Sequence, residues 1–86
     1  MTANLLSRLQ GLKAPSNEID MAFEIATFEP DDTYKAVRAN DAGTKLVYTL
    51  ADGRTVTHWA WDHTLTQDRR DRCIAILTAL EARKNG

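Results

Sequence analysis

The sequence has few of the residues that mark disulfides, linkers or membrane segments. Its 86 residues include one cysteine, four glycines and two prolines, with no glycine- or serine-rich run. A lone cysteine excludes an intramolecular disulfide, and a chain this short without linkers has room for a single domain, residues 1–86. The apolar runs span only a few residues, too few for a membrane-spanning helix or a signal peptide. We therefore expect a single-domain soluble protein of the cytoplasm.

The sequence also lacks an excess of positive charge. Eleven lysines and arginines face twelve acidic residues, which gives a formal net charge of -1. Binding to a phosphate backbone or an anionic membrane surface without a specific site needs a clear basic excess. The charge balance therefore makes nucleic acid an unlikely partner and argues against a membrane surface.

The first third of the chain predicts two helices, 3–12 and 17–28. Helix 3–12 has leucines at helical spacing, and Ser16 is a suitable N-cap for helix 17–28. The second helix has two apolar stripes on different sides. One contains Ile19, Ala22, Phe23 and Ala26, and the other contains Met21, Ile25 and Phe28. A surface helix normally buries one stripe, so the second must be covered by helix 3–12 or by another chain.

The middle of the chain alternates with the period of a β-strand. Segments 44–50 and 55–61 flank Asp52 and Gly53, a dipeptide typical of a two-residue type I′ hairpin turn. A strand at 33–39 precedes them. Together they predict a three-stranded antiparallel meander.

A two-residue turn fixes the register of this hairpin. It places Leu50 opposite Thr55 and Leu46 opposite Trp59. One face of the hairpin then collects the large apolar side chains and should pack against helices. These side chains are Leu46, Tyr48, Leu50, Trp59 and Trp61.

The last element is predicted as a helix over 66–83. Thr64 and Gln67 resemble a capping box at its start, and Cys73 falls on its apolar face, where a thiol is buried and inert. The element order is therefore α-α-β-β-β-α. This order predicts an α+β fold in which the meander packs against helices.

Two segments resemble a known family. The segment PSNEID, from Pro15 to Asp20, resembles the P-S-R-E-L-D opening of the phage ABA-sandwich domain, with Asn17 where that family has arginine. The segment CIAILTALEAR, from Cys73 to Arg83, resembles the C-terminal C-x-A-A-L-x-A-x-x-A-R helix of the same family. The resemblance implies a phage or prophage origin, the cytoplasm of a host cell, an α+β fold and no established enzymatic activity.

Only one cluster has side chains of mixed metal-binding or catalytic type. His58, Asp62 and His63 flank the end of the last strand, but the two histidines do not have the helical spacing of metalloprotease ligands. The isolated glycines form no phosphate-binding or dinucleotide-binding motif. We therefore expect no catalytic residue, no metal site and no cofactor, and we expect the two histidines to be ordinary strand and loop residues.

Arg69, Arg70 and Arg72 gather at the start of the last helix, where the helix dipole disfavours cations. Interleaved Asp68 and Asp71 offer pairing on the helix surface as the simpler explanation. The alternative is an anion or nucleic-acid contact through the three arginines, with one of the two tryptophans as a stacking partner.

The sequence therefore favours a noncatalytic protein that binds another macromolecule. Its predicted contact surface is the second stripe of helix 17–28 with an acidic rim, an arrangement typical of an interface. The surface consists of Met21, Glu24, Ile25, Phe28, Asp31 and Asp32. Its occupant is a host or phage protein: a second copy in a homodimer is the simplest form, and a CRISPR or other defence effector of the host is a more specific one. Simple solvation of these acidic residues is the alternative.

Overall fold

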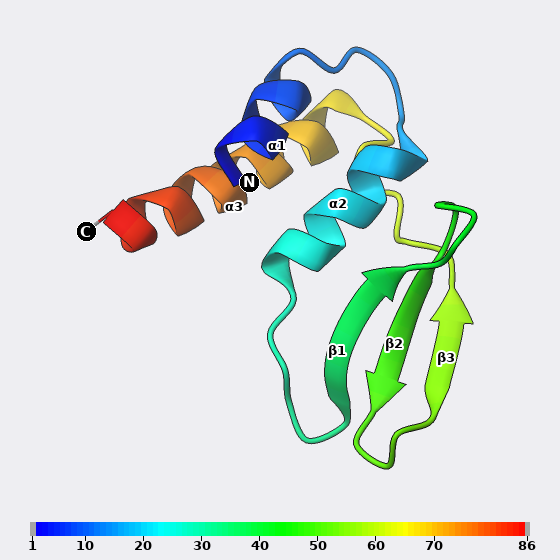
Figure 1. Cartoon of the computed structure of the whole chain (residues 1–86). Coiled ribbons are helices and arrows are strands. Elements are labelled where there is room, and N and C mark those ends of the chain that lie inside the picture. Colours follow the sequence, from blue (N-terminus) through cyan, green and yellow to red (C-terminus); the bar gives the residue numbers. More distant parts are fainter. Residues whose placement is uncertain (1, 86) are drawn as a thin grey trace.

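The computed structural model describes the backbone of residues 2–85 and the side chains of residues 4–83 (Figure 1). Its elements occur in the predicted order, which confirms the α+β class. The elements are α1 (Thr2–Gln10), α2 (Asn17–Thr27), β1 (Tyr34–Ala39), β2 (Leu46–Leu50), β3 (Thr55–His58) and α3 (Gln67–Asn85). None of the helices within residues 2–85 has an apolar stretch of the length that a bilayer crossing needs.

The three strands form an antiparallel meander in the order β1-β2-β3. The turn between β2 and β3 is one residue longer than predicted. Gly53 N donates to Leu50 O (3.0 Å), and Leu50 N donates to Arg54 O (2.7 Å), so the loop contains three residues. Gly53, with φ of 90°, has the left-handed conformation that such a loop requires after its type I turn. The two-residue turn predicted from Asp52 and Gly53 was wrong.

The longer turn shifts the register by one residue and exchanges the two faces of β3. Leu46 pairs with His58 instead of Trp59, and Tyr48 pairs with Val56. A shift of one residue moves every side chain to the opposite face. The strand ends at His58, and the tryptophans that follow are 60% exposed at Trp59 and 75% exposed at Trp61. Their predicted place on the core face was therefore wrong.

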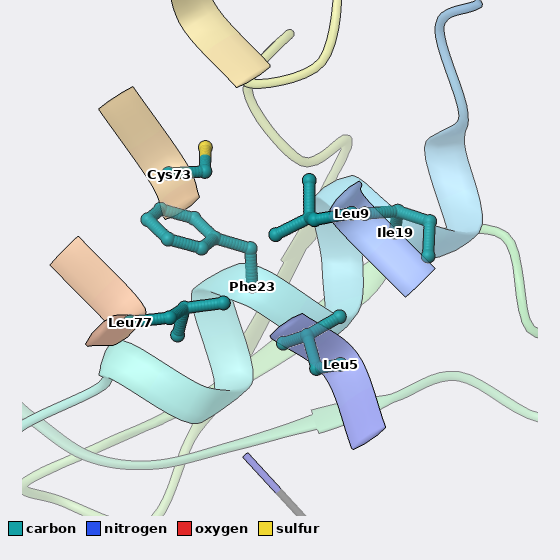
Figure 2. Close-up of a cluster of buried hydrophobic side chains, with 6 residues drawn as sticks. All are labelled: Leu5, Leu9, Ile19, Phe23, Cys73 and Leu77. Atoms are coloured by element: carbon teal, nitrogen blue, oxygen red, sulfur yellow. The ribbon is translucent and has the colours of Figure 1, made fainter. Parts of the chain in front are cut away.

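The first of two hydrophobic clusters joins the three helices. Ile19 and Phe23 of α2 pack there with buried residues of α1 and α3, and Figure 2 shows the ring of Phe23 directed toward α3. The cluster contains Leu5, Leu9, Ile19, Phe23, Cys73 and Leu77. The burial of Cys73, which is 3% exposed, agrees with the prediction from the apolar face of its helix.

The second cluster lies between α2 and the sheet. Met21, Leu46 and Ala60 are buried in it, with Val37 and Tyr48 packed against them. Helix α2 therefore lies between the α1–α3 pair and the sheet (Figure 1), and its two apolar stripes serve two different clusters. Met21 of the second stripe is covered by the sheet of the same chain and not, as was expected, by helix α1 or another chain. Ile25 of the same stripe is 40% exposed.

The cap of α3 also differs from the prediction. Thr66 Oγ1 accepts a hydrogen bond from Arg69 N (3.2 Å), and Thr66 O accepts one from Arg70 N (3.0 Å). Thr66 is thus the N-cap, and the capping box assigned to Thr64 and Gln67 was wrong. Thr64 is instead fully buried and has a different role.

Candidate functional site

The segment of residues 59–66 connects β3 to α3 and passes beside α2. We call it the connecting segment. Its buried residues Ala60 and Thr64 face the protein, whereas Trp59, Trp61 and Leu65 are exposed. A segment without regular structure keeps a fixed conformation only where its backbone groups and side chains find partners. In this segment the partners are polar side chains of α2 and α3.

Thr64 is the first anchor of the connecting segment. Its N–H donates to Asp20 Oδ1 (2.8 Å), its Oγ1 accepts from Ser16 N (2.8 Å), and its O accepts from Arg70 Nη1 (2.8 Å). Asp20 and Arg70 are 5% and 7% exposed. Each buried charge is thus stabilised by a hydrogen bond with the connecting segment.

The burial of Arg70 corrects the predicted arginine site. Besides Thr64 O, its guanidinium donates to Gln67 Oε1 (3.2 Å), and its Nε has no partner among the described residues. A group committed to these bonds cannot also reach an anion in solvent. The alternative anion site therefore loses Arg70 and retains Arg69 and Arg72.

Glu24 of α2 is the second anchor. One carboxylate oxygen, Oε1, accepts from Trp61 N (3.2 Å) and His63 Nε2 (3.0 Å), and Oε2 accepts from Tyr48 Oη (3.1 Å). The Glu24 side chain is only 10% exposed. A carboxylate that accepts from the imidazole requires a proton on Nε2 of His63. Glu24 therefore ties the connecting segment to α2 and to the middle of the sheet.

Tyr48 links this network to the end of β3. The ring of His58 stacks on it with centroids 4.8 Å apart and an interplanar angle of 11°. Burial, followed by the charge of the nearby Glu24 carboxylate, raises the pKa of Tyr48 to about 12. The phenol therefore remains a neutral hydrogen-bond donor to Glu24 throughout the neutral range.

The shifted pKa predicts a loss of stability at alkaline pH. The pKa of Tyr48 rises from an ordinary 10.0 to about 12 in the folded protein. The unfolded chain therefore loses this proton first, and the free energy of unfolding falls between these two pH values. Urea unfolding at intervals from pH 8 to about 12 should show that the stability advantage over Tyr48→Phe shrinks in this window. The other titratable groups are the same in the wild type and in Tyr48→Phe, so their effects cancel in the comparison. A difference in stability between the two proteins that stays constant from pH 10 to about 12 would contradict the prediction.

An open pocket of about 400 Å³ lies between α2, the connecting segment and α3. Its apolar lining comes from Phe23, Cys73 and Ile76, and Trp61 and His63 add aromatic rings. The rings of Phe23 and His63 have centroids 4.8 Å apart. A concave, largely apolar lining with a few polar groups is typical of a binding site.

The charged lining of the pocket comes from Asp62, Arg69 and Arg72. Arg69 Nη1 donates to the backbone oxygen of Asp62 (3.0 Å), which positions the guanidinium beside the connecting segment. Neither Arg69 nor Arg72 forms an ion pair with any residue described in the structure. Both are exposed, so the pocket has two cations at its edge against one carboxylate.

The surface predicted on α2 is only partly accessible. Met21 is 4% exposed, and Glu24 is used by the connecting segment, so these two assignments to a partner surface were wrong. Phe28 is half-buried, with its ring centroid 6.1 Å from that of Tyr48. Ile25 is 40% exposed.

The two aspartates predicted at the rim lie in the loop before β1. Both are exposed. Asp31 Oδ1 accepts from Thr33 N (2.8 Å) and Tyr34 N (2.7 Å). These backbone bonds to Tyr34 and Thr33 hold the pKa of the Asp31 carboxyl below its ordinary value. Asp31 thus has a local role in the turn, while the partner contact predicted for Asp31 and Asp32 stays a prediction.

Of the candidate reactive side chains, His58, His63 and Cys73 make contacts within the fold, whereas Asp62 is exposed at the pocket. His58 is exposed but stacked, and His63 bonds to Glu24. Burial, with a contribution from the charge of Asp20, raises the pKa of the Cys73 thiol, which donates to His63 O (3.6 Å). A thiol with a raised pKa is a poor nucleophile. Among the side chains that the structure describes, no three histidines, cysteines or acidic residues lie close enough together to hold a metal ion.

The pocket was not predicted, because the sequence pattern had indicated that Trp61 lies in the core. The triplet Trp59-Ala60-Trp61 allows either the tryptophans or the alanine to face inward, since strand periodicity fits both. In the fold the small Ala60 takes the inward position beside Met21 and Leu46, and both tryptophans face solvent.

No family model, curated protein or solved structure matches the chain.

Proposed function

We propose that the protein is a noncatalytic binding protein and that it contacts a partner protein through Trp61 and the pocket beside it. The observation that carries this proposal is the 75% exposure of Trp61 on a segment fixed by internal hydrogen bonds. A large aromatic ring left in water contributes little to folding. Tryptophan and arginine are the residues most enriched at the energetic centres of protein interfaces.

Two further features support binding without catalysis. Three of the polar groups that could act as acid or base, Glu24, His63 and Tyr48, bond to one another and to the backbone of the connecting segment. The lone thiol, Cys73, is buried and has a raised pKa. The hydrogen bonds of Glu24 thus hold the surface around Trp61 in place.

The nature of the partner follows from the resemblance to phage proteins. This resemblance favours a protein of the host cell or the phage, including a defence effector. A second copy of this chain is the simplest alternative. Nucleic acid is less favoured, because the chain has a net charge of -1 and the buried Arg70 leaves a small cationic area.

Capture from a lysate of the source cells tests the proposal. The tagged protein is incubated with nuclease-treated and untreated halves of the lysate, and bound proteins are identified by mass spectrometry. We expect one protein enriched in both halves. Trp61→Ala should weaken its capture by at least about 30-fold, the effect of losing an interface hot spot.

The matched control is Leu65→Ala, an exposed apolar residue of the same segment that does not line the pocket. Capture by this variant should equal that of the wild type. Capture that disappears with nuclease would overturn the proposal in favour of nucleic acid. If no protein is captured and the protein is a dimer in solution that Trp61→Ala dissociates, the partner is a second copy of this chain. If no protein is captured and the protein is a monomer, the proposal is rejected.

A further inference from the structure

We infer that the pocket beside Trp61 binds an acidic peptide segment, with a large apolar side chain of the partner in the pocket and a neighbouring carboxylate on Arg69 and Arg72. The inference rests on the proposed function and names the chemistry of the partner. It follows from the apolar lining, the two unpaired cations and the rigidity of the connecting segment.

The apolar lining of the pocket suits an apolar side chain of the partner. Phe23 and Cys73 belong to the helical cluster, and the pocket lies where that cluster meets the surface. Ile76, 40% exposed, and Trp61 extend the apolar lining outward. A volume of about 400 Å³ lies in the range of binding pockets, roughly 300–1,000 Å³, so a leucine or phenylalanine side chain can enter.

The two arginines at the pocket suit a carboxylate of the partner. Arg69 and Arg72 are exposed at the pocket and form no ion pair with any of the side chains that the structure describes, those of residues 4–83. Arg69 donates through Nη1 to Asp62 O, which leaves its other N–H groups available. Arg69 also lies in the first turn of α3, where the helix dipole disfavours a cation. A carboxylate from a partner would compensate this charge, and a guanidinium can bind it in a bidentate manner.

The connecting segment is held in place by hydrogen bonds to α2 and α3. Trp61 N and His63 Nε2 donate to Glu24, and Thr64 is bound to both α2 and α3. One wall of the pocket is therefore formed before any ligand arrives. A preformed wall reduces the entropy lost when a flexible peptide binds.

The same groups suit a nucleotide less well. Trp61 could stack on a base, but only two cations line the pocket, and Asp62 adds a negative charge beside them. A nucleotide phosphate carries more negative charge than one carboxylate and usually meets a denser set of donors. The apolar residues Phe23, Cys73 and Ile76 instead match an apolar side chain.

Selection from a random peptide library tests the inference. The wild-type protein is the bait, and enriched peptides are synthesised and titrated into Trp59→Phe protein, in which Trp61 is the only tryptophan. We expect enriched sequences to place Asp or Glu within two positions of a large apolar residue and to change the fluorescence of Trp61. Affinity for the wild-type protein should fall with added salt, and the double variant Arg69→Gln, Arg72→Gln should bind about tenfold more weakly with little dependence on salt.

The control variant is Arg54→Gln, which alters an exposed arginine of the β2–β3 turn. It should bind the peptides as the wild type does, and circular dichroism should show all variants folded. Peptides that bind the double arginine variant as tightly as wild type, or that lack acidic residues, would overturn the inference. If their binding still requires Trp61, the proposed function survives.

Two other outcomes would also overturn the inference. In the first, AMP added as a competitor at micromolar concentration displaces the bound peptides. This result would make the pocket a nucleotide site. The second is the absence of any enriched peptide while lysate capture still depends on Trp61. That second outcome would leave a partner protein that binds by a folded surface.

Discussion

Replacing Leu77 by alanine is expected to destabilise the protein by about 2–5 kcal/mol. Leu77 is 0% exposed and lies in the cluster that joins α1, α2 and α3 (Figure 2). Removing its branched end leaves a cavity, because the surrounding helices relax only in part. Domains of this kind are stable by roughly 5–15 kcal/mol, so the loss is a large share of the total. Urea unfolding followed by circular dichroism measures it.

The control is Ile76→Ala, one position earlier on the same helix. Ile76 is 40% exposed and faces the pocket, so we expect a loss below about 1 kcal/mol. Equal losses at the two positions would contradict the orientation of α3. The pair thus separates burial in the helical cluster from the general cost of losing an apolar side chain in a helix.

The elements were predictable because their signals are local. The leucine stripe of α1, the Ser16 cap of α2 and the apolar face of α3 each depend on residues a few positions apart. Ser16 Oγ accepts from Ile19 N (3.2 Å), so α2 begins at the predicted residue, Asn17. The order of helices and strands followed from such signals, and with it the α+β class.

The register of the hairpin was not predictable from the same kind of signal. A type I′ turn and a three-residue loop with glycine in the left-handed conformation both accept the Asp52-Gly53 dipeptide. Asp52 Oδ1 accepts from Arg54 N (3.0 Å), and this bond accompanies the longer loop. The choice between two turns differing by one residue determines which face holds Trp59 and Trp61, and so whether a candidate site exists there.

The burial of Met21 and Glu24 within the surface expected on α2 was not predictable for a related reason. The sequence reveals that α2 has two apolar stripes, but it does not say which element covers each stripe. Met21 is covered by Leu46 and Ala60, which lie 25 and 39 positions further along the chain. The polar anchors Glu24 and Thr64 likewise bond to residues distant in sequence. Such contacts depend on the assembled fold and leave no periodic pattern.

Replacing Glu24 by alanine is expected to cost about 2–3 kcal/mol, because three donors lose their acceptor at once. These donors are Tyr48 Oη, Trp61 N and His63 Nε2. The matched control is Glu18→Ala on the same helix, where the carboxylate is 75% exposed and pairs with Arg8. An exposed pair contributes little, so this variant should lose less than about 1 kcal/mol. Urea unfolding of both variants gives the comparison.

Glu24→Ala should also loosen the connecting segment before the protein unfolds. Amide hydrogen exchange at Trp61 should become faster, while exchange at Leu77 in the helical cluster should follow only the change in global stability. Because Glu24 holds the backbone of Trp61, partner capture should fall at temperatures where the variant is still folded. Exchange at Trp61 that matches the Glu18→Ala control would mean that Thr64 and Ala60 hold the segment without the carboxylate.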